Sequence, residues 1–214
     1  MVGDLLAPQL RQYLDALVPS RPAEMEAMEA YAREARFPII GPVAGQFCYL
    51  LARIVGARRV FEMGSGFGYS TAWFARAVRE NGGGTVFHVV WDEELSRRAR
   101  THLGTLGFGE IIQYRVGEAV DTLRRTDGTF DLIFNDIDKE GYPGSLPVIA
   151  EKLRPGGVLI ADNMFWQGRV FDEQDRTATT RGVRELTRMI TSDPRWISSI
   201  VPIRDGLLVA YRAM

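Results

Sequence analysis

The chain has little of the residue types on which many functional sites depend. Its single cysteine, Cys48, excludes an intrachain disulfide and a multi-cysteine zinc site. Because Cys48 lies in an apolar run, we expect a packed core thiol rather than a nucleophile. Lys and Arg (26) nearly balance Asp and Glu (27), which leaves a formal net charge of −1. This balance gives no general attraction to nucleic acids or anionic membranes, and neither is expected as a partner.

Long apolar runs are also missing. No stretch approaches the roughly 20 apolar residues of a membrane span. Asp4 stands early in an N-terminus without a long apolar segment, which argues against a signal peptide. We find no repeat, low-complexity tract or linker in the 214 residues, of which 46% are hydrophobic. We therefore expect one domain over residues 1–214, with a substantial core, in a reducing cytoplasm.

What the chain does have is an alternation of helical and strand-like segments. Helical spacing over 5–18, 23–36 and 44–55 predicts N-terminal helices within residues 1–56 that cover the sheet or supply a dimer surface. Strands are then expected at 59–63, 85–91, 111–116, 130–134 and 158–162, and helices at 70–80, 93–106, 118–125 and 146–152. Alternation of this kind predicts an α/β fold with a mostly parallel, doubly wound sheet.

The last part of the chain departs from this alternation. Residues 167–181 are polar and strand-poor, which is typical of a loop or lid. A helix is expected near 182–192. Strand-like segments at 197–203 and 207–210 then flank Asp205-Gly206, which predicts a C-terminal antiparallel hairpin.

The most informative run is VFEMGSGFGYS at 60–70. An apolar strand ends near an acid, and three alternate glycines lead into a helix that starts near Ser70. Glycines let the backbone approach a bound molecule closely, and the helix N-terminus offers free N–H donors. The G-x-G-x-G spacing differs from the dinucleotide-binding G-x-G-x-x-G. The run predicts a binding loop, although a strand–turn–helix corner without a ligand remains the alternative.

A second group of polar residues follows two later strands. The strand at 130–134 is followed by Asp136, Asp138 and Lys139, and the strand at 158–162 ends in Asp162 and Asn163. Open α/β sheets bind ligands at the carboxyl ends of their strands. Carboxylate and amide oxygens without His or Cys suit a hard cation such as Mg²⁺, Mn²⁺ or Ca²⁺. Turn-capping by these aspartates is the alternative.

Taken in order, these motifs resemble the cation-dependent small-molecule O-methyltransferases, the group that includes catechol and caffeoyl-CoA O-methyltransferases and their bacterial members. The likeness runs over residues 38–212 and includes GQF at 45–47, the glycine motif, GEA at 117–119, FNDIDKEGY at 134–142, PGG at 155–157 and DN at 162–163. It implies a Rossmann-like fold that binds S-adenosylmethionine (SAM). It also implies methyl transfer from SAM to a hydroxyl of a catechol-like or other small aromatic acceptor by a homodimer.

The resemblance also assigns roles to residues. It implies that Lys139 is the catalytic base and that Asp136, Asp162 and Asn163 ligate the cation, with Mg²⁺ favoured. The positions that it and the glycine loop together assign to SAM binding are Ile40, Glu62, Gly64, Ser65, Gly66, Gly68, Ser70, Ala119, Asp136 and Asp138. Trp166 and Tyr142 are interpreted either as walls for an aromatic ring or as core residues.

One position departs from the family pattern. The family places an acid at the end of the second strand to accept hydrogen bonds from the ribose, and Val90 stands there. Asp92 shares a strand face with Val90 and is expected to substitute if the strand end bends. Trp91 is expected to stack on the adenine.

Two other classes of function compete with the methyltransferase. A non-catalytic nucleotide-binding module is favoured by Val90, but it gives no reason for a lysine beside clustered carboxylates. A nicotinamide oxidoreductase is disfavoured by the glycine spacing and by the missing ribose-binding acid.

Overall fold

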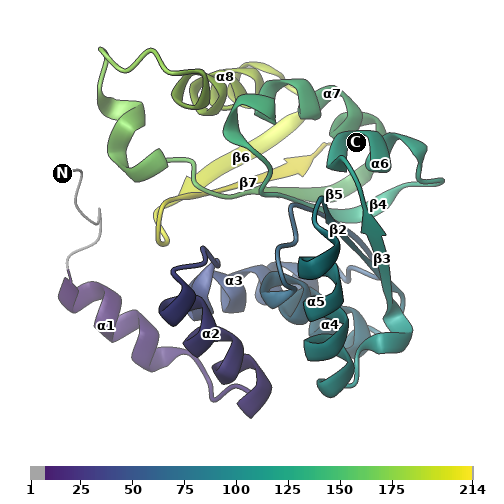
Figure 1. Cartoon of the computed structure of the whole chain (residues 1–214). Helices are drawn as coiled ribbons and strands as arrows, with labels where there is room; N and C mark the ends of the chain where they lie inside the picture. Colours follow the sequence, from purple (N-terminus) through teal and green to yellow (C-terminus); the bar gives the residue numbers. More distant parts are fainter. Residues whose placement is uncertain (1–7, 214) are drawn as a thin grey trace.

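The computed structural model describes residues 8–213. They form a seven-stranded sheet with helices packed against it (Figure 1). The strand order is β3-β2-β1-β4-β5-β7-β6. The strands are β1 (Arg59–Met63), β2 (Thr85–Val90), β3 (Ile112–Val116), β4 (Phe130–Asn135), β5 (Leu153–Ala161), β6 (Trp196–Val201) and β7 (Leu207–Arg212). The first five strands pair in parallel, and β7 runs antiparallel to both β5 and β6. The predicted α/β fold with a C-terminal antiparallel hairpin is thus confirmed.

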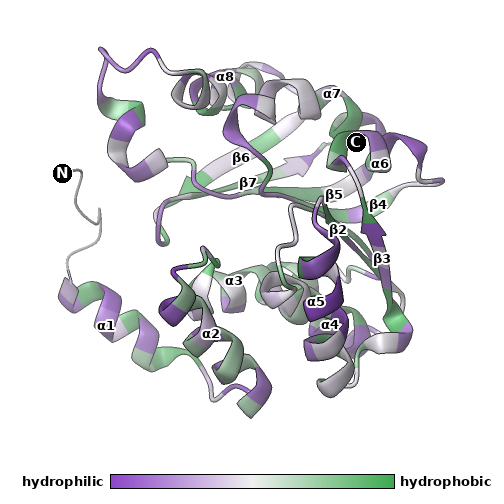
Figure 2. Ribbon diagram, viewed as in Figure 1, coloured by the Kyte–Doolittle hydropathy of each residue, from purple (hydrophilic) through white to green (hydrophobic). Residues whose placement is uncertain are grey.

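Helices lie on both sides of the sheet. They are α1 (Pro8–Leu17), α2 (Ala23–Ala35), α3 (Gly41–Ile54), α4 (Tyr69–Glu80), α5 (Glu93–Thr105), α6 (Ala119–Arg125), α7 (Tyr142–Lys152) and α8 (Ala178–Ser192), with short 3₁₀ turns η1 (Gly109–Ile111), η2 (Lys139–Gly141) and η3 (Trp166–Phe171). In Figure 1, α2–α5 lie on one side of the sheet and α6–α8 on the other. Each layer closes its own hydrophobic core against the strands, whose apolar character is visible in Figure 2.

The N-terminal helices differ in how much they bury. Met25 and Met28 of α2, and Ala44 and Cys48 of α3, belong to the core, so the predicted core position of Cys48 is confirmed. In contrast, α1 has no buried residue. Residues 5–7 of the first expected helix lie outside the described residues. Over residues 8–213, no helix is long and apolar enough to cross a membrane.

Four element starts differ from the sequence prediction by three residues or more, and one of them is that of α7, which begins at Tyr142 rather than at Leu146 with Pro143 in its first turn. Helix α3 begins at Gly41, because Pro42 is tolerated in a first turn. Strand β5 begins at Leu153 and includes Pro155-Gly156-Gly157, where the pairing with β4 shifts register. Helix α8 begins at Ala178, within the expected loop, since the Thr177 hydroxyl caps it by accepting a hydrogen bond from the Thr180 N–H.

Candidate active site

The carboxyl ends of β1, β4 and β5 meet at one edge of the sheet. Met63 pairs with Asn135 across β1 and β4, and Asn135 pairs with Ala161 across β4 and β5. The residues that follow stay in step, because the Asp136 N–H donates to the Met63 carbonyl at 2.9 Å and the Asp162 N–H donates to the Asn135 carbonyl at 3.2 Å. The two predicted aspartates therefore leave neighbouring strands side by side.

The glycine loop between β1 and α4 lies against this edge. Gly64, Gly66 and Gly68 all have left-handed backbone angles. Gly64 is sterically required, because a Cβ there would lie 2.3 Å from the carbonyl oxygen of Asp136. Ser65 ties the loop to β2, since the Val89 N–H donates to its Oγ at 2.9 Å. The loop thus passes directly over the start of the Asp136 segment.

Glu62 presents a buried carboxylate beneath the glycine loop. Its Oε2 accepts a hydrogen bond from Thr71, whereas its Oε1 is buried and has no hydrogen-bond partner within residues 8–213. Burial raises the pKa of Glu62 to about 7, although hydrogen bonds from Ser70 and Thr71 act in the opposite direction. A buried acceptor without a partner is costly, so the site suits a ligand that carries a positive N–H donor.

Strand β2 ends in the residues at which the sequence departs from the family pattern. Val90 is buried, and Trp91 is 66% exposed. Asp92 is the N-cap of α5, where its Oδ1 accepts a hydrogen bond of 2.8 Å from the Leu95 N–H. This oxygen is therefore already engaged. The sequence offered a signal for this, because an aspartate directly before two glutamates is a common helix start.

Two further predicted cofactor positions lie at helix starts. Ala119 is the first residue of α6, which the Glu118 side chain caps by accepting from the N–H groups of Val120 and Asp121. Ile40 precedes α3 and is buried. The structure places Ala119 just beyond the carboxyl end of β3, on the same sheet edge as the glycine loop.

Lys139 is held in place by three acceptors. Its Nζ donates to Asp136 Oδ1 at 2.7 Å, to Tyr142 Oη at 2.9 Å and to the Ile137 carbonyl at 3.2 Å. It is 6% exposed, and α8 packs closely on its backbone at Gly182. Burial raises the pKa of Asp136 to about 6, although the charge of Lys139 acts in the opposite direction. Tyr142 is fully buried and belongs to the core, not to a substrate wall.

Arg204 reaches this edge from the β6–β7 turn and was not among the site residues predicted from the sequence. Its guanidinium forms an ion pair with Oδ2 of Asp162, whose Oδ1 accepts from the Asn163 N–H at 2.8 Å. Burial alone would lower the pKa of Arg204, but the carboxylates of Asp162, Asp136 and Asp205 raise it. The signal was a basic residue next to the predicted Asp205-Gly206 turn. Its significance depends on where the hairpin docks.

Asn163 is oriented by the same turn. Its Nδ2 donates to Asp205 Oδ2 at 3.1 Å, and the other oxygen of Asp205 accepts from the Gln167 N–H at 2.7 Å. Within the part of the chain that the structure describes, no group of three or more His, Cys, Asp or Glu side chains is arranged to hold a metal ion. The donor set predicted from the sequence is two carboxylates and one amide, Asp136, Asp162 and Asn163.

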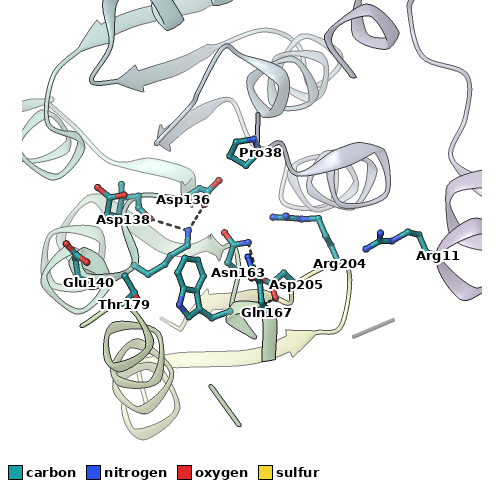
Figure 3. Close-up of a pocket in the computed structure, with 13 residues that line it drawn as sticks. Arg11, Pro38, Asp136, Asp138, Glu140, Asn163, Gln167, Thr179, Arg204 and Asp205 are labelled. Carbon is teal, nitrogen blue, oxygen red and sulfur yellow. Dashed lines mark hydrogen bonds and ion pairs between the residues drawn. The ribbon is translucent and has the colours of Figure 1, made fainter. Parts of the chain in front are cut away.

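The residues around Lys139, Asn163 and Arg204 line a cavity of about 800 Å³ (Figure 3), whereas Glu62 and the glycine loop are not part of its lining. Of the predicted site residues, the cavity lining includes Asp136, Asp138, Lys139 and Asn163, and Trp166 lines it as well. Asp162 lies deeper and is 1% exposed. The site thus combines a buried amine, carboxylates and an aromatic wall, which suits proton transfer on a small aromatic molecule.

Comparison with known proteins agrees with this geometry. The O-methyltransferase family profile matches residues 24–213. A catechol O-methyltransferase of Niastella koreensis is 33% identical over 188 residues, which are 83% of this chain and 84% of the relative. The solved structure of the O-methyltransferase TomG from Streptomyces achromogenes, in complex with SAM, has a TM-score of 0.86 and 26% identity over 98% of this chain and 100% of that one.

A second solved structure extends the comparison. The O-methyltransferase from Bacillus cereus, in complex with SAH, has a TM-score of 0.86 and 28% identity over 95% of this chain and 97% of that one. The matches cover the glycine loop, the carboxylate edge and the C-terminal hairpin together. The chain belongs to the O-methyltransferase family and is a SAM-dependent O-methyltransferase.

Proposed function

We propose that the enzyme transfers the methyl group of SAM to a hydroxyl of a catechol-like or other small aromatic acceptor. The observation that carries the proposal is the position of Lys139, a buried amine on the wall of a cavity that Trp166 also lines. A phenol must lose its proton to become a good nucleophile, and a lysine within hydrogen-bond reach can accept it. The relative named catechol O-methyltransferase supports the same acceptor class.

Several residues of the site are suited to bind SAM. The unpartnered Oε1 of Glu62 would accept a hydrogen bond from the ammonium of SAM. Gly64, Gly66 and Gly68 leave space for the backbone to approach the ligand, and Asp138 lines the adjoining cavity. SAM supplies an electrophilic methyl group when bound, and the chain's own residues orient the acceptor and remove its proton.

The donor set also fits a hard divalent cation, with Mg²⁺ favoured. Asp136, Asp162 and Asn163 would hold it through their side-chain oxygens, since Asn163 uses its Nδ2 toward Asp205 and has its Oδ1 for a ligand. When bound, the cation would lower the pKa of an acceptor hydroxyl and fix its orientation. Asp136 would then exchange part of its interaction with Lys139 for the cation.

Turnover with a panel of catechols and simple phenols tests the proposal. Lys139→Ala should lower kcat by about 10²–10⁴-fold while the KM for SAM stays near the wild-type value. Lys152→Ala is the matched control, because the Lys152 amine donates to the Thr126 carbonyl, outside the cavity lining. SAM binding without turnover on any aromatic acceptor would overturn the proposed acceptor class and leave the family assignment intact.

The cation is tested separately. Chelation should abolish methylation of a catechol, and added Mg²⁺ or Mn²⁺ should restore it. Full activity in excess chelator would overturn the cation site and leave the methyltransferase assignment intact.

The same proposal includes a homodimer. Helix α1 exposes Leu10, Tyr13 and Leu17, with 44%, 64% and 61% of their surface accessible. A second copy would bury this apolar face, which has no covering element among residues 8–213. Light scattering should give twice the monomer mass for the wild type, and Leu17→Glu should shift the mass toward the monomer.

A further inference from the structure

Arg204 holds an unusual position for a long cationic side chain. It stands in the β6–β7 turn with a left-handed φ of 53°, a conformation that costs energy for residues other than glycine. Only 30% of its side chain is exposed, and its Nε is buried without a hydrogen-bond partner in the described chain. The fold therefore tolerates strain and a buried unpaired donor to bring this guanidinium to the sheet edge.

The two carboxylates that the proposed cation would use, Asp136 and Asp162, are each paired with a positive side chain in this arrangement. Lys139 pairs with Asp136, and Arg204 pairs with Asp162. Each carboxylate thus has its own counter-ion. A divalent cation between these carboxylates would meet two positive side chains at close range, and like charges that are partly shielded from water repel strongly. The Arg204 charge and a bound cation are therefore mutually unfavourable.

The contacts of Asp162 also indicate that Arg204 and a cation exclude each other. Asp162 has two oxygens, of which Oδ1 accepts from the Asn163 N–H and Oδ2 binds Arg204. The Asp162 oxygen that accepts no backbone N–H is thus the one that the guanidinium covers. Arg204 also has space to move, since it borders a second cavity of about 230 Å³ that Asp15 and Ile40 line as well.

We infer that Arg204 is an intramolecular cation that takes the metal's place on Asp162 and competes with it. The divalent cation then binds only after the guanidinium has left Asp162, and residue 204 sets the cation affinity of the site. This inference rests on the cation site of the proposed function.

The experiment measures Mn²⁺ binding to metal-stripped protein by calorimetry, without SAM or acceptor. Arg204→Gln keeps much of the side-chain length but removes the charge, and Arg204→Gly also relieves the left-handed strain. Both should bind Mn²⁺ more tightly than the wild type, by about tenfold or more. Arg11→Ala is the matched control. Arg11 lines the same cavity from α1, and its loss leaves the Arg204–Asp162 pair intact, so it should change the affinity much less.

A second measurement covers the metal-free state. Without metal, Arg204→Gln should unfold at a lower temperature than the wild type, because the buried Asp162 loses its counter-ion. Mn²⁺ should stabilise the variant more than it stabilises the wild type.

Three results would overturn the inference, and they are distinguishable. Equal Mn²⁺ affinity in the wild type and Arg204→Gln would show that Arg204 does not compete, while the cation site stands. Absence of Mn²⁺ binding in both proteins would remove the cation site itself. A wild type that is fully active in chelator, with an inactive Arg204→Gln, would show that the guanidinium replaces the metal outright.

Discussion

Lys139 Nζ donates a hydrogen bond of 2.9 Å to Oη of Tyr142, and this hydroxyl in turn donates to the backbone carbonyl of Asp162 at 2.8 Å. The candidate base on η2 is thereby connected to the end of β5. Because Tyr142 is fully buried, its ring cannot shift without disturbing the core. We therefore propose that Tyr142 positions the candidate base Lys139.

Tyr142→Phe should therefore weaken catalysis without removing the base. The change keeps the ring and removes one acceptor from the Lys139 ammonium. We expect a loss of about 1–3 kcal/mol in the free energy of unfolding, and a fall in kcat that exceeds any change in the KM for SAM. Denaturant unfolding and steady-state kinetics measure the two effects.

Tyr114→Phe is the control for that change. The Tyr114 hydroxyl is buried and has no hydrogen-bond partner within the described residues, so its removal should leave stability equal or higher. If Tyr142→Phe behaves like Tyr114→Phe in both assays, Tyr142 does not position the base.

Because the Glu62 carboxylate is buried, we expect the SAM affinity to depend on pH. Burial raises its pKa from 4.5 to about 7, so the free protein carries a neutral Glu62 below that pH. An ammonium ligand prefers the charged form. SAM affinity should therefore fall as the pH drops below about 7, approaching tenfold per pH unit. Calorimetry between about pH 5 and pH 8 measures this, and Glu62→Gln should bind weakly with little pH dependence.

The same group affects the stability of the free protein with a defined sign. Between its unfolded value of 4.5 and its folded value of about 7, the folded state binds a proton that the unfolded chain releases. The free energy of unfolding should therefore decrease as the pH rises through this window. Glu62→Gln should remove that part of the slope. An unchanged slope would show that Glu62 titrates outside the window.

Much of the fold and part of the site could be predicted because their signals are local. The buried strands, the alternate glycines after Glu62 and the polar residues after β4 and β5 lie in short runs, and parallel topology brings strand ends together. The ion pair of Arg204 with Asp162 could not be predicted, since it depends on where the β6–β7 hairpin docks beside β5. The core position of Tyr142 likewise depends on how α7 packs on the sheet.

A larger side chain at Gly182, which lies outside the cavity lining, should displace Lys139 through steric contact. A Cβ at this position of α8 would lie 2.1 Å from the carbonyl oxygen of Lys139, so Gly182→Ala must displace α8 or η2. We expect a loss of about 1–3 kcal/mol in the free energy of unfolding, together with a lower kcat.

Gly144→Ala is the matched control for Gly182→Ala. Gly144 lies within α7, and a Cβ there meets nothing within 4 Å. The change should stabilise the protein by about 0.5–1 kcal/mol through helix propensity alone, with kcat unaltered. Similar results for the two variants in thermal unfolding would contradict the close packing of α8 on Lys139.

The residues at the end of β2 allow a prediction about how the ribose of SAM is bound. The Val90 side chain can neither accept nor donate a hydrogen bond, and the Oδ1 of Asp92 is engaged in capping α5. A carboxylate that accepts from a neutral hydroxyl contributes roughly 1.5–3 kcal/mol, which corresponds to about 10- to 150-fold in affinity. Val90→Asp should therefore tighten SAM binding within that range. Val116→Asp places the same acid at the end of the neighbouring β3 and should not tighten it.

Asp92→Ala separates the two roles that Asp92 can have. If Asp92 only caps α5, the variant should lose about 1 kcal/mol of stability and keep its SAM affinity. If Asp92 also holds the ribose through its other oxygen, SAM binding should weaken in Asp92→Ala, and Val90→Asp should then add little. The two effects on affinity are thus expected to be anticorrelated. Calorimetry that finds SAM affinity unchanged in both variants would show that the ribose is not held at the end of β2.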